Sequence, residues 1–248
     1  MAVTTKLLVF ACVSLLIPYL YLIVEEGREL RVWEQAPSTL TLYNTPEVCV
    51  QHYGGDGRLI ETTMMTEEAR SENSHVLNCG QCGKCSNQHD INIYDETREI
   101  LTDITTDCVK GGLFRGMNLG YIWQCLKDHS TLTDPCVDCW ILNVECNWKY
   151  CLNTCIKHKV RPFRWLPSLY SRSHESTMDP CLECDERMCG PPFVKCAGAN
   201  RRRVGLVSDI QRDIELEVCN KVDWDYIRKT AQSQLQKQAD QQSEADEL

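Results

Sequence analysis

The sequence lacks the short motifs that mark several common classes of enzyme. Its 248 residues contain no GxSxG, HExxH, GxGxxG or GxxxxGK. These patterns supply a serine nucleophile, a pair of zinc ligands, a dinucleotide-binding turn and a phosphate-binding loop. Their absence argues against enzymes that depend on them, and no pair of carboxylates stands in a pattern that indicates acid–base catalysis. We therefore predict a non-enzymatic protein and keep enzymatic activity as an alternative.

Phenylalanine and positive charge are also scarce. There are 4 phenylalanines, and 26 lysines and arginines stand against 35 acidic residues, which gives a formal net charge of −9. So few large aromatic side chains, beside many cysteines, indicate a modest core supplemented by cross-links. The negative charge argues against a nucleic-acid partner, because phosphate neutralisation needs a positive surface. The basic run Arg201–Arg203 predicts a solvated loop, with an anion or headgroup site as the alternative.

Cysteine, in contrast, is abundant. The chain contains 17 cysteines, of which Cys12 lies in the hydrophobic N-terminal segment and the remainder form an even set. An even number at this density, in a chain with an export segment, predicts complete pairing in an oxidising compartment. The residues predicted to form disulfides are Cys49, Cys79, Cys82, Cys85, Cys108, Cys125, Cys136, Cys139, Cys146, Cys151, Cys155, Cys181, Cys184, Cys189, Cys196 and Cys219.

A hydrophobic segment near the N-terminus predicts export. Residues Leu7–Val24 carry no charge, and their number reaches the length that crosses a bilayer. No small-x-small cleavage site lies near the end of this segment. We predict that residues 1–27 form a signal-anchor with a single membrane span; a cleaved signal peptide is the alternative. In both cases the remainder is exported, and we predict the membrane as a partner, protein partners of unknown identity and no nucleic acid.

The exported part divides by composition into a lead-in and a main domain. Residues 28–74 are poorly patterned and contain the turn-like stretch GGDG, so they predict an irregular stalk with a short strand near Val48–Tyr53. Residues 75–228 predict one all-α, disulfide-rich domain of four to five helices.

The last segment, residues 229–248, is polar and low in complexity, which is typical of a frayed helix or a disordered tail. Its final residues are Ala245, Asp246, Glu247 and Leu248. They share Asp-Glu-Leu with the KDEL and HDEL retrieval signals, so we predict retention in the endoplasmic reticulum. An acidic tail without a signalling role is the alternative.

The main domain is predicted to be organised around a helix that runs from Asp134 to about His158. Asp134 suits the N-cap and Pro135 the first helical position, and no glycine or proline follows before Pro162. Five cysteines fall within about half the circumference of such a helix. They are Cys136, Cys139, Cys146, Cys151 and Cys155.

Other helices follow from apolar spacing and from an internal repeat. The opening DPCVDC at Asp134 recurs as DPCLEC at Asp179–Cys184, which predicts a second helix that begins in the same way. Steps of three and four residues predict amphipathic helices over Tyr94–Cys108 and Leu119–His129. Cys125 lies near the buried face of the second of these, and His129 is interpreted as a helix-end residue. A capping box and apolar spacing predict a further helix over Ser208–Val218.

The densest cysteine cluster is NCGQCGKCSN, with Cys79, Cys82 and Cys85 two residues apart. We predict that the three belong to three separate structural bridges. The alternative is a redox centre, because neighbouring thiols can resolve a mixed disulfide. CGQC and CGKC resemble the CGxC centres of protein disulfide isomerases, and the triple spacing is similar to that of the luminal Ero-type thiol oxidases. That resemblance implies thiol–disulfide exchange on client proteins; it covers about ten residues and no βαβ pattern surrounds it.

Zinc is the third chemical possibility, because two thiolates one helical turn apart can share one ion. Here the two DPCxxC units lie further apart than the half-sites of ordinary zinc modules, and we predict neither a metal nor a cofactor. Our main prediction is a structural or interaction protein of the secretory pathway or cell surface. A luminal thiol–disulfide oxidoreductase is the second hypothesis, and a zinc-binding membrane protein is the third.

Overall fold

The computed structural model describes residues 45–159, 179–206 and 219–246, together with residues 20 and 24. They form two compact units. The larger unit contains residues 45–145, 190–206 and 219–246, and the smaller unit contains residues 146–159 and 179–189. Within the described residues, no helix has both the length and the apolar character that a membrane span needs. The predicted segment Leu7–Val24 lies almost wholly outside them, so the anchor stays a prediction.

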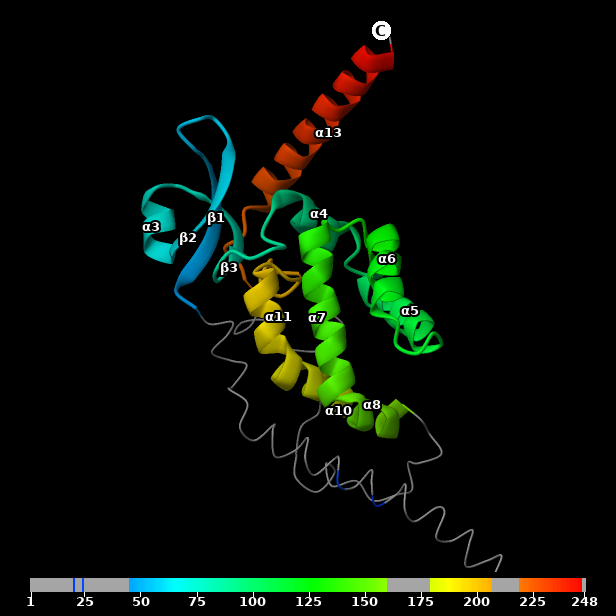
Figure 1. Cartoon of the computed structure of the whole chain (residues 1–248). Coiled ribbons are helices and arrows are strands. Elements are labelled where there is room, and N and C mark those ends of the chain that lie inside the picture. Colours follow the sequence, from blue (N-terminus) through cyan, green and yellow to red (C-terminus); the bar gives the residue numbers. More distant parts are fainter. Residues whose placement is uncertain (1–19, 21–23, 25–44, 160–178, 207–218, 247–248) are drawn as a thin grey trace, which may run out of the picture. The chain divides into compact units, whose positions relative to one another are not determined.

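The larger unit begins with a small antiparallel sheet, which corrects the all-α prediction (Figure 1). Strands β1 (Glu47–Tyr53), β2 (Leu59–Met65) and β3 (His75–Cys79) lie in the order β2-β1-β3, and α3 (Thr66–Ser71) follows β2. The predicted short strand is β1, but the irregular structure expected around it was wrong. Strand β2 escaped notice because most of its side chains are exposed, which leaves no alternation of apolar and polar residues to read.

Most of the larger unit is helical, as predicted. Its helices are α4 (Gln88–Glu96), α5 (Leu101–Leu113), α6 (Leu119–Ser130), α7 (Asp134–Tyr150), α11 (Gly190–Ala197) and α13 (Trp224–Asp246). Of α7, the part up to Glu145 belongs to this unit. The core brings together side chains from α4, α5, α6 and α7, among them Tyr94, Leu101 and Ile122. The single helix predicted over Tyr94–Cys108 is in fact two, because residues 97–100 form a turn between α4 and α5.

The polar C-terminal segment is a helix in the structure. Asp223 caps the start of α13, where its Oδ1 accepts the N–H of Tyr226, and Ile227 is fully buried. The Gln88 side chain of α4 donates to the Ile227 carbonyl at 2.8 Å and joins the two helices. Further along, the helix is exposed, as Leu235 at 62% shows. The end of the predicted retrieval signal and the predicted helix Ser208–Val218 lie outside the described residues.

The smaller unit consists of short helical segments. It contains the end of α7, α8 (Leu152–Lys159), α10 (Pro180–Cys184) and the π-helical turn η2 (Asp185–Cys189). Its buried cluster consists of cysteines with Tyr150 and Met188 against them. Asp179 caps α10 by accepting the N–H groups of Cys181 and Leu182, as predicted for the repeated DPC opening. The long central helix was predicted as continuous, whereas the chain turns at Cys151 between α7 and α8.

Candidate functional site

All sixteen cysteines beyond the N-terminal segment are paired, in eight bridges. The prediction of a disulfide-rich helical protein is therefore confirmed, and so much cross-linking fits a protein of an oxidising compartment. The bridges are Cys49–Cys82, Cys79–Cys219, Cys85–Cys136, Cys108–Cys125, Cys139–Cys196, Cys146–Cys189, Cys151–Cys184 and Cys155–Cys181.

The predicted cluster of Cys79, Cys82 and Cys85 divides among three of these bridges. Each of its sulfurs joins a segment far along the chain, at separations of 140, 33 and 51 residues. No two cysteines of the cluster are joined to each other. A thiol that attacked one of them would therefore release a distant partner and would not open a bridge inside the motif.

Backbone contacts explain the glycines of this cluster. The N–H groups of Lys84 and Cys85 donate to the carbonyls of Cys196 and Ala197 at 2.8 Å each, which ties the segment to the end of α11. Here Gly83 passes so close to Gly198 that a Cβ on either residue would collide with the other backbone. The glycine of CGKC is therefore required by packing at this point of the fold.

Two of the three arginines in the basic run near this cluster are buried, so the prediction of a solvated loop was wrong for them. Arg202 and Arg203 are each 7% exposed. The Arg203 carbonyl accepts the N–H of Cys79 at 2.8 Å, and its guanidinium lies against Gly80, whose positive φ and missing side chain leave room for it. Arg203 thus holds the segment that carries Cys79.

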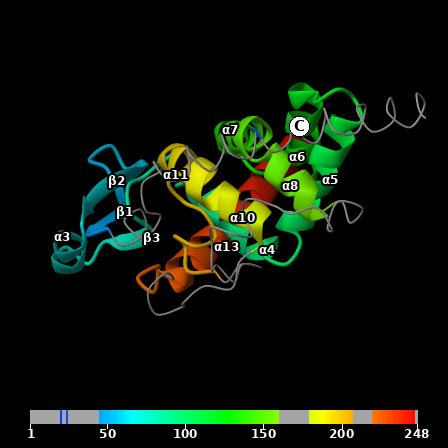
Figure 2. The same ribbon diagram turned by 90° about the horizontal axis from the view of Figure 1, so that it is seen from below.

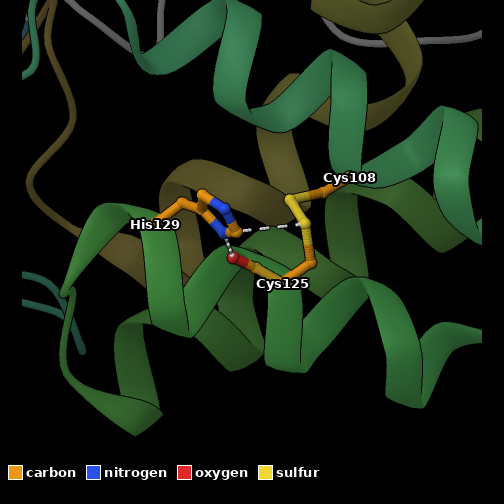
Figure 3. Close-up of side chains that lie close together, drawn as sticks. All are labelled: Cys108, Cys125 and His129. Atoms are coloured by element: carbon orange, nitrogen blue, oxygen red, sulfur yellow. Dashed lines mark hydrogen bonds between the residues drawn. A yellow bond between two sulfur atoms is a disulfide. The ribbon is translucent and has the colours of Figure 1, made fainter.

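One bridge has an ionisable side chain beside it (Figure 3). Cys108 of α5 and Cys125 of α6 join two helices that lie side by side in both views (Figures 1 and 2). His129 lies one turn after Cys125 on α6, and its Nδ1 is 3.9 Å from the Cys125 sulfur. Cys108 is buried at 1% exposure, whereas Cys125 is half-buried and His129 is exposed. The disulfide therefore has an exposed imidazole beside its half-buried sulfur.

The hydrogen bonding of His129 sets its tautomer. Nδ1 is 2.8 Å from the Cys125 carbonyl oxygen, and because a carbonyl oxygen only accepts, Nδ1 carries a proton and donates it. The same N–H lies within reach of the Cys125 sulfur. His129 also belongs to the last turn of α6, where the helix dipole favours a cation. The arrangement can stabilise a thiolate on Cys125 if the bridge opens.

Two groups of side chains in the described residues have the spacing of metal ligands. They are Cys108 with Cys125 and His129, and Cys85 with Asp90 and Cys136. In both groups the two sulfurs form a disulfide, and a disulfide has no thiolate to bind zinc. Asp90 is also engaged, because its carboxylate accepts from Thr133 N–H at 2.7 Å. The zinc hypothesis thus requires a reduced protein and stays a prediction.

A second cluster of ionisable residues joins β3 to the start of α13. His75 Nδ1 is 3.1 Å from Asp223 Oδ2, and the His75 ring is stacked on Tyr226 with centroids 3.6 Å apart. Partial burial acts to raise the pKa of Asp223, but hydrogen bonds from the Tyr226 N–H and from His75 outweigh it and lower that pKa. Burial raises the pKa of Tyr226. The cluster links β3 to the start of α13 and has a structural role.

His129 is the residue that the sequence reasoning missed. Its interpretation as a helix-end residue is confirmed, because it lies in the last turn of α6, but its contact with the Cys108–Cys125 bridge was not predicted. Its separation of four residues from Cys125 was the available signal, since side chains at i and i+4 of a helix meet on one face. The pairing with Cys108 could not be read from the sequence, because it depends on how α5 and α6 pack.

Comparison with known protein families finds a match over one part of the chain. A profile described as a family of unknown function (DUF8771) matches residues 120–221, which is less than half of the chain. The match includes Cys125 and His129 and both DPCxxC units. No curated protein matches the chain. No solved structure matches it either.

Proposed function

We propose that this protein is a non-enzymatic structural or interaction module of the secretory pathway or cell surface. The observation that carries the proposal is the distribution of its bridges. Every cysteine of the CxxCxxC cluster is used to hold a distant segment, and Cys85 is fully buried together with its partner Cys136. Such bridges stabilise a fold.

The fold around the cluster supports the same proposal. Tyr94 lies under the Cys85–Cys136 bridge, with its hydroxyl 3.5 Å from the Cys136 sulfur, and accepts a hydrogen bond from Trp140. Desolvation raises the pKa of this phenol well above its usual range, so it stays neutral and is no proton acceptor at ordinary pH. Its surroundings are those of a packed core. The oxidoreductase hypothesis for Cys79, Cys82 and Cys85 stays a prediction.

The first experiment measures the redox state of the cluster. The full chain, made in an oxidising compartment, is alkylated under denaturing conditions without reduction and mapped by mass spectrometry. We expect no alkylation at Cys79, Cys82 or Cys85, because all three are paired. Free thiol at any of them in the folded protein would contradict the proposal.

The second experiment tests for catalysis. The purified chain is added to a reduced, denatured disulfide protein, and the rate at which that protein regains its bridges is compared with buffer alone. A scaffold leaves the rate unchanged. An acceleration that disappears in the double variant Cys49→Ser with Cys82→Ser, but persists in the remote pair Cys146→Ser with Cys189→Ser, would make the cluster an oxidoreductase centre.

A further inference from the structure

Among the eight bridges of the described residues, the one between α5 and α6 has the shortest separation along the chain. Cys108 and Cys125 are 17 residues apart, whereas the other seven bridges span between 26 and 140 residues. In the chain-entropy description, a disulfide stabilises less as the loop it closes becomes shorter. Taken one at a time against the unbridged chain, this bridge therefore contributes the least stabilisation of the eight.

The helices it joins are also held together without it. Gly111 and Gly112 let α5 approach α6 so closely that Cβ atoms at these positions would meet the rings and methyl groups of Tyr121 and Ile122. Arg115 strengthens the same contact, since its guanidinium lies 4.0 Å from the centre of the Tyr121 ring. The α5–α6 pair therefore keeps its packing when the sulfurs separate.

Access to the two sulfurs is unequal. Cys108 is buried, and Cys125 is half-buried beside the exposed His129. A thiol from solvent therefore meets the Cys125 sulfur first. The Nδ1–H of His129 is 3.9 Å from that sulfur, close enough to stabilise negative charge on it.

We propose that Cys108–Cys125 is an exchangeable disulfide that reacts with small thiols of the glutathione class, with His129 as its positioning and charge-stabilising residue. A thiolate RS⁻ attacks the Cys125 sulfur, the S–S bond to Cys108 breaks, and its electron pair leaves on Cys108, which takes up a proton. A second thiolate attacks the R-side sulfur of the mixed disulfide and expels Cys125 as a thiolate beside His129. The bridge gains two electrons and two thiols are oxidised to RSSR.

This site goes beyond the proposed scaffold function, and it differs from the predicted redox cluster. Seven bridges stay closed, so the scaffold is preserved while one pair of helices gains two thiols. The product is a Cys125 thiolate paired with an imidazole, which is a reactive arrangement in proteins. The inference thus assigns a modification site to a framework that is otherwise inert.

The structure contains a control for accessibility alone. In the Cys155–Cys181 bridge both cysteines are half-buried, so this pair offers solvent more than Cys108–Cys125 does. If exposure decided reactivity, Cys155–Cys181 would open first. If the neighbouring imidazole and the direct packing of α5 on α6 decide it, Cys108–Cys125 opens first.

The test exposes the full oxidised chain to buffers of reduced and oxidised glutathione in graded ratio. Samples are quenched by alkylation and mapped by mass spectrometry. We expect Cys108 and Cys125 to be labelled, and glutathione to be found on Cys125, at ratios that leave the other bridges closed. First opening of Cys155–Cys181, or simultaneous opening of all bridges, would overturn the proposal.

Variants then test the part of His129. His129→Ala should slow the release of Cys125 from its mixed disulfide with glutathione several-fold, because the Cys125 thiolate that forms in this step loses the Nδ1–H beside it. His129→Lys, which places another N–H donor at this position, should restore much of the rate. Gln124→Ala, an exposed neutral position on the same helix, is the matched control and should leave the rate unchanged. An unchanged rate in His129→Ala would overturn the mechanism.

A last variant keeps the result interpretable if His129→Ala unfolds. The pair Cys108→Ser with Cys125→Ser should fold and should bind no glutathione under the same conditions. Glutathione uptake by this variant at another cysteine would contradict the assignment. Opening of the bridges of Cys79, Cys82 or Cys85 in any of these samples would count against the scaffold proposal and not against this one. The failures of the two proposals are therefore distinguishable.

Discussion

At the scale of single residues, hydrogen-bond donors around a carboxyl group decide how strongly its charged form is favoured. Asp223 accepts the N–H of Tyr226 through one oxygen and faces His75 through the other. Both contacts favour the carboxylate, and they outweigh the partial burial that opposes it, so the pKa of Asp223 is lowered. The residue therefore stabilises the native state as an anion.

This gives a prediction for pH dependence. Because the pKa of Asp223 is lower in the folded than in the unfolded chain, its contribution is present above the unfolded value and is lost as pH falls through the folded one. Asp223→Asn keeps an oxygen for the Tyr226 N–H and removes the charge. We expect it to lower the free energy of unfolding at pH 7 by less than about 1 kcal/mol, because the site is partly exposed.

The measurement is urea unfolding of both proteins between pH 7 and pH 2. The difference between Asp223→Asn and the parent chain should shrink as the pH falls. Asp225→Asn, an exposed carboxylate in the same first turn of α13, is the control for loss of charge near a helix start. A difference that stays constant with pH would show that the charge of Asp223 has no part in stability.

At the scale of elements, the fold depends on close approach of backbones. The segment 83–86 lies against the end of α11, and the Ser86 hydroxyl accepts the N–H groups of Gly83 and Ala199 at 2.9 and 3.0 Å. The two N–H groups come from opposite sides of the contact, so one buried side chain satisfies both. This contact positions Cys85 for its bridge to α7.

Gly83 therefore cannot accept a side chain without moving one of the two elements. We expect Gly83→Ala to lower the free energy of unfolding by about 2 kcal/mol or more, since the clash is with backbone and not with a flexible side chain. The measurement is chemical unfolding of the oxidised protein. Gly55→Ala is the matched control, because a Cβ at that position meets nothing within 4 Å. Equal stability of the two variants would refute the close contact.

At the scale of the whole molecule, the covalent connections cross the chain many times. Five bridges join cysteines before residue 160 to cysteines after residue 178: Cys79–Cys219, Cys139–Cys196, Cys146–Cys189, Cys151–Cys184 and Cys155–Cys181. Residues 207–218, in contrast, are spanned by Cys79–Cys219 alone. The bridges therefore predict which cuts separate the chain into pieces.

The recognition sequence of a site-specific protease replaces residues 164–170 in one variant and residues 209–215 in another. Each variant is cut and then denatured without reduction. We expect both to migrate as one species on a non-reducing gel. With Cys79→Ser and Cys219→Ser added, the cut at 209–215 should release the C-terminal piece, whereas the cut at 164–170 should still release nothing. Release of fragments by the cut at 164–170 would show that the pairing is wrong.

Much of this architecture was predictable from local pattern. The helices α6 and α10 and the strand β1 follow from apolar spacing, capping residues and a short β-rich run, because these signals lie within a few residues of one another. The central helix was predicted as continuous to about His158, whereas the chain turns at Cys151, and β2 was not predicted. Both depend on contacts that neighbouring residues do not reveal. The candidate site was missed for the same reason.

The amino-acid sequence by itself determined which kinds of interaction stabilise this protein, namely disulfides and helix packing. Its cysteine count and density, its hydrophobic N-terminal segment and its helical periodicity are countable along the chain, and they predicted a disulfide-stitched helical protein for an oxidising compartment. Only the tertiary structure decided which cysteine joins which, that the CxxCxxC cluster divides among three distant partners, and that His129 faces the Cys108–Cys125 bridge. The physical reason is that pairing depends on which sulfurs the packed helices bring within bonding distance, and that packing is a property of residues far apart in the chain.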